Sequence, residues 1–538
     1  MMIDYTRMQQ IKMPLVEVPQ FSKRDTAYVE EDPTLKPFYK YSVHIDSFEK
    51  VIHDKSKESI DRNTLVEVLK EQYSKLKLSP LTTERIQSLT DKNTFTIITA
   101  HQPSLFTGPL YYIYKIVSTL NLVKKLQLHY PDYKFVPVFI TGGEDHDFEE
   151  VNHVHIFNKT LQWDNQESGS VGMMKTESLQ PVLSELKEIL GAGENATKLF
   201  ELISTAHSRN SRYSDAVIDM VNEIFGKDGL VILNMNNTRL KRLFIPIIKE
   251  EVFNNPSIRL VGETRDELEL AGFKPQAFPR EINFFYLRDQ LRARIEQVDG
   301  KYKVLDTDFE FTKEELEAEI ENHPERFSPN VITRPLFQEK ILPNLAYIGG
   351  GGEIAYWLER KSQFKHFGIN FPMLIRRDSV LWVDSNSIKK LDKLGLKIND
   401  LFQKEDEIIR KFVENQSAED LNLKSQKARL QNIFEDISLL ADKIDPTLSK
   451  SIMAEHSKQQ KVIDQLESRI VRAEKQKHET AINQIRVLKN KFFPNDGLQE
   501  RYDNFMAFYL RYGEEFVDTL KDSLDPLEKK MTIILDMD

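Results

Sequence analysis

The chain has 538 residues, of which 40% are hydrophobic and 29% charged, and its formal net charge is -10. This length exceeds what one hydrophobic core normally serves, so we expect two or three domains, and the acidic balance argues against nucleic acid as a partner. The absence of cysteine excludes disulfides, a cysteine nucleophile and thiolate-bound metal; the lack of a signal-peptide region or of any apolar run near the roughly 20 residues that span a bilayer predicts a cytoplasmic protein with no membrane partner.

Residues 1–90 are predicted to be mostly helical and irregular. A strand–helix–strand unit is predicted to follow them. Apolar, β-branched runs at 95–98 and 135–140 predict two strands. The segment between them has the helical spacing of Tyr112, Ile116, Leu120, Val123 and Leu126. A strand, helix, strand order predicts parallel strands with a right-handed crossover. The loops after both strands then leave the same sheet edge, where ligands bind in open α/β sheets.

The loop after the first of these strands carries polar side chains and a stiffening proline. Its candidate binding residues, with one from the helix behind it, are His101, Gln102, Ser104, Thr107, Gly108 and Lys115. A helix that begins after small residues suits a phosphate or a carboxylate. Ordinary capping, with Thr107 as the N-cap and Pro109 in the first turn, explains the same residues without a ligand.

The loop after the second strand is acidic. It supplies our candidate catalytic residues, Glu144, Asp145, His146 and Asp147, with Gly143 before them and Asn152 after them as candidate binding residues. In an extended loop alternate side chains point opposite ways, so we expect Asp145 and Asp147 on one side, and Glu144 and His146 on the other. Such a cluster can accept a proton, orient an ammonium group or bind a metal. Alternatively, the acidic residues only favour the dipole of a following helix.

Further strands are predicted at 230–234, 345–348 and 371–375, separated by inserted regions of about 160–225 and 239–330. The second insertion contains a polar hairpin around Gly300. Near its end the apolar α/β pattern returns, and residues 349–352 are four glycines that precede a helix from about Ile354. Glycines permit torsions and close approaches that other residues do not, so this turn either faces a ligand or packs tightly.

Several residues around the glycine turn are candidates for binding. They are Arg334, Tyr347, Gly349, Gly350, Gly352, Glu353, Tyr356 and Arg377. The arginines are suited to anionic groups of a substrate, and ordinary structural ion pairs are the alternative. No serine-hydrolase elbow, zincin motif or kinase signature is present.

From about residue 385 the strands are expected to end and charged helical sequence to dominate. Apolar side chains over 423–440 and again over 446–491 follow helical steps on either side of Asp445-Pro446, which predicts an antiparallel hairpin. The second run is long enough for one helix of roughly 65 Å. We expect a homodimer through residues of about 421–492, along the apolar seams of Leu430, Ile437, Val462, Leu466 and Ile470. An aromatic face near Tyr502 and Phe505 is expected to pack back on the core.

Taken in order, these segments resemble one known family. The motifs are LFTGPLY at 105–111, GEDHDF at 143–148, FSPN at 327–330 with TRPL at 333–336, and LAYIGG at 345–350 with GEIAYW at 352–357. With the terminal hairpin, they resemble the bacillithiol biosynthesis cysteine-adding enzyme family. The family commonly has glutamine where this chain has His101, and proline where it has Gly351.

The resemblance implies an α/β fold with a Rossmann-like parallel-sheet core and helical insertions over 1–384. It further implies an α-helical coiled-coil domain over 385–500, associated with homodimerisation, and we expect a C-terminal segment, 501–538, to pack back on the core. The implied reaction is the final step of bacillithiol biosynthesis, a ligation of L-cysteine to the amine of glucosaminyl malate. ATP is expected as cosubstrate by analogy of fold, because amide formation from a free carboxylate needs activation. Whether a metal is needed stays open.

In this hypothesis residues 144–147 hold the amine or act as base, while His101, Gln102 and the glycine turn line the nucleotide or carboxylate site. Two alternatives stay open from the residues alone. One is a non-catalytic dimeric scaffold that binds a nucleotide or sugar, and the other is a metal-dependent hydrolase that uses histidine and aspartate.

Overall fold

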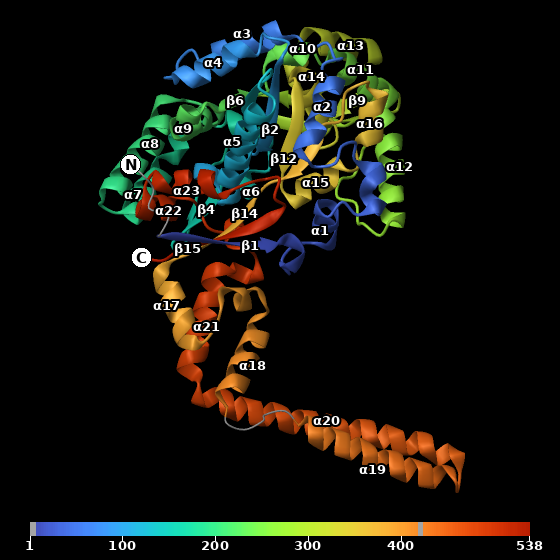
Figure 1. Ribbon diagram of the computed structural model, residues 1–538. Helices are drawn as coiled ribbons and strands as arrows, with labels where there is room; N and C mark the ends of the chain where they lie inside the picture. Colours follow the sequence, from blue (N-terminus) through green and yellow to red (C-terminus); the bar gives the residue numbers. More distant parts are fainter. Residues whose placement is uncertain (1–6, 418–422) are drawn as a thin grey trace. The chain divides into compact units, whose positions relative to one another are not determined.

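The computed structural model describes residues 7–417 and 423–538 (Figure 1). The chain divides into two compact units. The first, called here the coiled-coil unit, comprises Met1–Gln9, Trp382–Gln499 and Ile534–Asp538. The second, called here the sheet unit, comprises Gln10–Leu381 and Glu500–Ile533. The expected start of the helical hairpin near Leu421 lies outside the described residues.

The sheet unit is built on five parallel strands in the order β13-β12-β2-β3-β6 (Figure 1). Their bounds are β2 Thr94–His101, β3 Lys134–Thr141, β6 Val231–Asn234, β12 Asn344–Gly349 and β13 Met373–Arg376. β2 is the central strand, in register with β3 through Thr99 opposite Phe139 and with β12 through Ile98 opposite Tyr347. All five predicted strands are confirmed, and so is the Rossmann-like parallel core.

Helix α5, Tyr111–His129, makes the expected crossover from β2 to β3. The middle of both strands is buried, because neighbouring strands cover their edges and helices cover their faces. Leu122 and Val123 of α5 and Val51 of α2, Phe48–Lys55, join one hydrophobic cluster with side chains of β2, β12 and β13. The remaining helices before the sheet are α1 Lys23–Val29, α3 Arg62–Gln72 and α4 Pro80–Ser88.

The two inserted regions have different structures. The first contains a short helix, a small antiparallel ribbon and three longer helices: α6 Phe148–Val151, β4 His153–Ile156, β5 Lys159–Gln162, α7 Gln180–Leu190, α8 Glu194–Arg209 and α9 Tyr213–Phe225. The second contains four helices and an antiparallel sheet in the order β10-β9-β8-β7-β11. These are α10 Thr238–Arg242, α11 Ile245–Asn254, α12 Pro256–Leu270, α13 Lys313–Asn322, β7 Phe284–Arg288, β8 Leu291–Val298, β9 Lys301–Val304, β10 Glu310–Phe311 and β11 Phe327–Pro329.

The hairpin predicted around Gly300 is confirmed, since β8 and β9 pair through Val298 and Lys301 across a turn in which Asp299 and Gly300 have φ of 52° and 79°. The remaining helices of the sheet unit follow this insertion or return after the coiled coil. They are α14 Arg334–Ile341, α15 Gly351–Trp357, α16 Lys361–His366, α22 Met506–Tyr512 and α23 Glu515–Ser523.

Three strands were not predicted. β1 Met8–Pro14, β15 Lys530–Asp536 and β14 Ser379–Val383 form a sheet in the order β1-β15-β14. Residues 1–90 are therefore not only helical and irregular, and strands do not end at residue 385. The strands that pair in this sheet lie far apart in the sequence, so local periodicity does not reveal the sheet.

The coiled-coil unit contains α17 Ser385–Leu394, α18 Glu405–Gln416, α19 Lys424–Asp442, α20 Pro446–Lys477 and α21 Glu479–Phe492. Asp445 caps α20, as the Asp-Pro break predicts, and α19 packs along α20. The expectation of one helix over 446–491 is wrong, because His478 has φ -110° and ψ 19° and separates α20 from α21. Helix α21, with buried residues such as Ile485, packs against α17 and α18, whereas α20 packs against α19. The two segments therefore bury different apolar faces, which one straight helix does not provide. No helix within the described ranges is both long and apolar enough to cross a membrane.

Candidate active site

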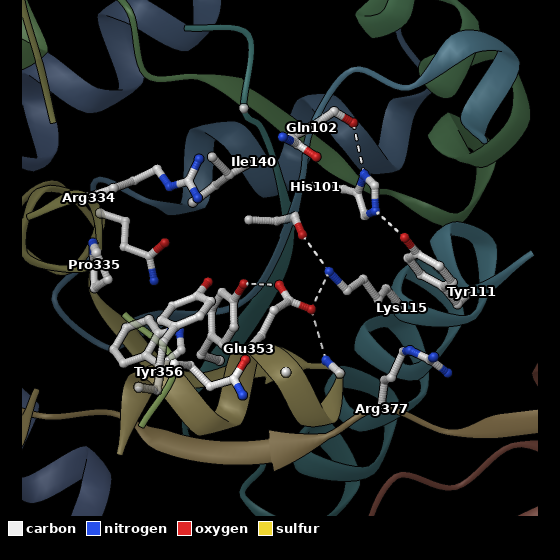
Figure 2. Close-up of a pocket in the computed structure, with 18 of the residues that line it drawn as sticks. His101, Gln102, Tyr111, Lys115, Ile140, Arg334, Pro335, Glu353, Tyr356 and Arg377 are labelled. Atoms are coloured by element: carbon white, nitrogen blue, oxygen red, sulfur yellow. Dashed lines mark hydrogen bonds and ion pairs between the residues drawn. The ribbon is translucent and has the colours of Figure 1, made fainter. Parts of the chain in front are cut away.

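A cavity of about 640 Å³ opens at the carboxyl ends of β2, β3 and β12 (Figure 2). This is the sheet edge at which the sequence predicts a site. Among the predicted residues, its wall contains His101, Gln102, Lys115, Arg334, Tyr347, Gly350, Gly352, Glu353, Tyr356 and Arg377. The wall does not contain Ser104, Thr107, Gly108, Gly143, Glu144, Asp145, His146, Asp147, Asn152 or Gly349. Residues that the sequence analysis did not select also line it, among them Tyr111, Glu150, Gln276, Gln338 and Arg501.

Glu353 contacts three polar groups at the cavity (Figure 2). Its carboxylate accepts hydrogen bonds from the Tyr347 hydroxyl at 2.6 Å and the Gly350 amide at 2.8 Å, and its Oε2 lies 2.6 Å from Lys115 Nζ. Burial raises the pKa of Glu353, but Lys115 and the two donors outweigh it and bring the pKa below its ordinary value. Glu353 is therefore held as a carboxylate that fixes Lys115.

The glycine turn is tighter than predicted, because α15 begins at Gly351 rather than near Ile354. None of the four glycines has a positive φ, so the expectation that they serve special torsions is wrong. Gly351 is required by close approach instead, because a Cβ at this position would overlap the Asp25 carboxylate. A Cβ on Gly352 would have no atom within 4 Å, because this residue faces the open cavity.

His101 sits in the wall as a neutral imidazole. Its Nδ1 lies 2.9 Å from the Gln102 carbonyl oxygen, which can only accept, so Nδ1 carries the proton. Nε2, 3.2 Å from the Tyr111 hydroxyl, is then the acceptor. Burial and the nearby Lys115 lower the pKa of His101 to about 4. The ring therefore stays uncharged near neutral pH.

Arg334 differs from the other buried cations of the cavity. Its side chain makes neither a hydrogen bond nor an ion pair with any residue in the described part of the chain, although it reaches the cavity wall. Burial would lower the pKa of Arg334, but the nearby Tyr356 and the Asp145 carboxylate raise it above its ordinary value. Figure 2 shows Arg334 and Arg377 on opposite sides of Glu353.

The acidic loop is not extended, so the predicted alternation of its side chains is wrong. The Asp145 amide donates to the Gly142 carbonyl, which closes a turn at this point. Glu144 points away from the cavity, where Lys241 Nζ lies 2.5 Å and Ser328 Oγ 3.2 Å from its carboxylate oxygens. Since Lys241 is fully buried, this ion pair anchors the loop to the second insertion.

Asp145 and His146 lie side by side behind the cavity wall. Asp145 accepts a hydrogen bond from Gln102 Nε2 at 2.8 Å, and Arg292 lies 3.6 Å away. Burial would raise the pKa of Asp145, but its hydrogen bond with His146 and the charges of Arg334 and Arg292 bring it well below its usual range. Arg292 also donates to His146 Nδ1. Among the residues that the structure describes, no three histidine or carboxylate side chains are placed to hold a metal ion together.

The loop that contains Thr107 has unusual backbone. Phe106, Thr107 and Gly108 have φ of 45°, 74° and 61°, and α5 begins only at Tyr111, so Thr107 is not the helix cap. The Asn504 amide donates to the carbonyls of Phe106 and Gly108. Ser104 and Asn152 are buried in the scaffold around the two loops.

Sequence reasoning missed Lys241, Arg292, Arg501 and Asn504. They come from insertions or from the return segment after the coiled coil, far from both loops in sequence. No local motif marks them. Only the arrangement of the sheet unit brings them to the site.

Models of known families match nearly the whole chain. Residues 8–378 match the N-terminal Rossmann-like domain of bacillithiol biosynthesis BshC, and residues 380–535 match its C-terminal coiled-coil domain. A protein of Christiangramia forsetii, named "Putative cysteine ligase BshC", is 43% identical over 514 residues, which cover 94% of this chain and 95% of the relative. Relatives of the same name from Flavobacterium johnsoniae and Bacillus cytotoxicus are 42% and 29% identical, covering 96% and 91% of this chain and 97% and 94% of their own lengths.

These names agree with the ligase class that the motifs imply. Both matched domains occur here in the same order, the first on the parallel sheet and the second on the paired helices. The chain belongs to the BshC family of bacillithiol biosynthesis.

Proposed function

We propose that this protein joins the carboxyl group of L-cysteine to the amine of glucosaminyl malate, the last step in the synthesis of bacillithiol. Membership of the BshC family and the ligase name of its relatives support the reaction class. The single structural observation that carries the proposal is Arg334, a half-buried guanidinium in the cavity wall with no carboxylate partner of its own. A substrate with carboxylate groups supplies the partner that the described part of the chain does not.

The charge of the cavity supports an anionic substrate. Its wall carries the cations Lys115, Arg334, Arg377 and Arg501 and the carboxylates Glu150 and Glu353. Cations therefore outnumber carboxylates, although the whole chain has a net charge of -10. Focusing of positive potential in a cleft favours the binding of anions such as malate, a carboxylate or a phosphate.

A nucleoside triphosphate fits the same cavity chemically. It would supply the free energy of carboxyl activation, which amide formation in water requires. The residues present fit a polyanion, since Arg377 has a buried Nε without a partner and the glycine turn leaves room at Gly352. We infer that the side of the cavity near His101, Gln102 and Arg377 holds the nucleotide, and that Arg334 binds a substrate carboxylate.

The acidic loop is proposed to serve the amine. Asp145 stays ionised, so it is suited to orienting an ammonium group and poorly suited to removing its proton. His146 is more exposed than Asp145, and its Nδ1, which accepts from Arg292, is the ring nitrogen with a lone pair, so we assign proton acceptance to His146 Nδ1. Glu144 holds the loop in place through its ion pair with Lys241. Asp147 precedes helix α6, and its side chain makes no capping hydrogen bond there, so we assign it no separate role.

A product assay with cysteine, glucosaminyl malate and ATP tests the proposal, with mass detection of the amide. We expect Arg334→Gln to lower kcat/KM by roughly 10–100-fold, chiefly through KM, because a charge-assisted hydrogen bond to a substrate carboxylate is lost. Arg239→Gln, which removes exposed ion pairs to Glu67 and Glu71 and does not line the cavity, is the control and should leave kinetics unchanged.

Absence of product with the wild-type protein would contradict the ligase proposal. Tight nucleotide or sugar binding without turnover would then favour the scaffold alternative. Hydrolysis that appears only when a divalent metal is added would favour the metal-dependent hydrolase.

A further inference from the structure

Two consecutive arginines at the end of β13 are each held by a buried carboxylate from elsewhere in the chain. Arg376 Nε lies 2.8 Å from Asp25 Oδ1, and Arg377 Nη2 lies 2.7 Å from Glu500 Oε1. Only Arg377 lines the large cavity. The two pairs are therefore alike in chemistry and burial but differ in whether they face the site.

Both terminal nitrogens of the Arg377 guanidinium are engaged in hydrogen bonds. Its Nη1 donates to the Asp378 carbonyl and its Nη2 to Glu500, while Nε is buried and has no partner. The side chain is only 2% exposed, so the guanidinium cannot simply swing into solvent. A Cβ built on Gly350 would lie 3.7 Å from Nε, so the free donor sits beside the glycine turn.

Glu500 fixes this orientation. It is fully buried, its Oε2 accepts a hydrogen bond from the Val380 amide at 3.0 Å, and its Oε1 accepts from Ser379 Oγ at 3.2 Å. The carboxylate is thus tied to β14 as well as to Arg377. Because both terminal nitrogens of Arg377 are engaged, its Nε–H is the group that can donate a hydrogen bond to a ligand.

The residue after Glu500 brings a second cation to the same region. Arg501 lines the cavity and is exposed, and its side chain makes no hydrogen bond or ion pair with another described residue. Tyr111 is influenced by both cations: the Arg377 guanidinium sits 5.1 Å from its ring centroid, and burial raises the pKa of the Tyr111 hydroxyl while Arg377 and Arg501 oppose that rise.

We propose that Arg377 and Arg501 form an oxyanion subsite beside the glycine turn, and that Glu500 is the positioning residue that aims Arg377 Nε into it. The ligand is the oxyanion of a phosphate or a carboxylate. The inference deepens the proposed function, because it places one anionic group of the reactants at the side of Glu353 opposite Arg334 (Figure 2). Both Glu500 and Arg501 belong to the segment with which the chain re-enters the sheet unit.

Titration calorimetry on the full-length protein tests the subsite with three probes: ADP, inorganic phosphate and L-malate. Arg501→Gln alters an exposed side chain and should fold normally, yet weaken at least one probe by tenfold or more, with partial recovery in Arg501→Lys. Weakening of ADP and phosphate identifies a phosphate subsite, and weakening of malate alone identifies a carboxylate subsite.

The positioning role is tested by the matched buried pairs. Glu500→Gln should weaken the same probe as Arg501→Gln, whereas Asp25→Asn, which disturbs the neighbouring arginine, should lower Tm but bind that probe as the wild type does. The proposal is overturned if the wild type binds none of the probes, if Arg501→Gln binds all three normally, or if Asp25→Asn weakens binding as much as Glu500→Gln.

These measurements do not depend on product formation. A protein that makes no product but loses a probe through Arg501→Gln contradicts the ligase proposal and keeps the subsite. A protein that makes the product while Arg501→Gln binds every probe normally contradicts the subsite alone.

Discussion

Three buried cations at or near the cavity each have their own carboxylate, whereas the half-buried Arg334 has none among the residues that the structure describes. Lys115 lies against Glu353, Lys241 against Glu144, and Arg377 against Glu500. A buried ion pair contributes little net stability, but loss of one partner leaves an expensive unpaired charge. Such pairs hold side chains in place, so Arg377 keeps only its Nε for a ligand, whereas the whole Arg334 guanidinium is left for one.

The Lys115–Glu353 pair gives a prediction for stability. Glu353→Gln should lower the free energy of unfolding by about 3 kcal/mol, because Lys115 is left buried beside a neutral amide. Lys115→Met should have a similar effect, because it leaves the Glu353 carboxylate unpaired; the side chains of Lys115 and Glu353 are 3% and 23% exposed. The double variant should lose less than the sum of the two, measured by urea unfolding. Additive losses would show that the two side chains do not act as a pair.

His101 gives a prediction for pH. Its pKa is lowered from 6.5 to about 4 in the folded protein, because burial and Lys115 disfavour the charged ring. The unfolded chain therefore binds the proton more readily, so this contribution to stability is complete above pH 6.5 and is lost as pH falls toward 4. The full effect is at most about 3 kcal/mol.

Replacement by glutamine, His101→Gln, should flatten the decrease in stability between pH 6.5 and 4 by that contribution, measured by urea unfolding at several pH values. The buried His207, whose pKa is also lowered to about 4, remains as an internal reference. An unchanged pH dependence would contradict a neutral, buried His101.

At the scale of elements, the sequence predicts the parts of the site that follow from local pattern. The strands β2, β3 and β12 and the loops after them were placed correctly, because buried parallel strands are continuous apolar runs. The conformation of the acidic loop was not, since its turn depends on Gly142 and on the buried Lys241. The unpredicted break at His478 likewise reflects which helices α20 and α21 pack against. Contacts that come from distant segments decide these details.

The glycine turn gives a prediction with a built-in control. Gly352→Val should weaken binding of nucleotide or glucosaminyl malate while Tm changes little, because its side chain would enter open cavity space. Gly351→Val should instead cost stability, on the order of 1–3 kcal/mol, because its Cβ would overlap Asp25. Calorimetric titration and thermal melts on both variants separate the effects. If Gly352→Val loses stability and keeps both affinities, the turn serves packing and not binding.

At the scale of the whole molecule, the chain leaves the sheet unit at Leu381 and returns to it at Glu500. The returning segment supplies Glu500 and Arg501 to the cavity, and Asn504 to the strained loop at Thr107. No sequence pattern predicts this contribution, because the segment Trp382–Gln499 of the coiled-coil unit separates these residues from the rest of the site in the sequence. The point at which the chain returns from the coiled-coil unit therefore decides which residues complete the site.

The helices of the coiled-coil unit give the last prediction, a homodimer. Along α19 and α20, Ile437, Val462, Leu466 and Ile470 are 45%, 47%, 46% and 43% exposed, although each lies on an apolar seam. Covering a half-exposed side chain of this kind contributes on the order of 1 kcal/mol, so a partner helix pair along the seams gains several such contributions. A second copy of the chain has the matching pattern.

Light scattering at micromolar concentration should therefore give twice the monomer mass of 62.9 kDa. Ile437→Glu combined with Leu466→Glu should shift the protein toward monomer, because both charges would be buried in the interface. Gln460→Glu, on the exposed polar face of α20, is the control and should leave the mass unchanged. A wild-type monomer, or a dimer that both sets of variants leave intact, would show that these seams do not join two copies.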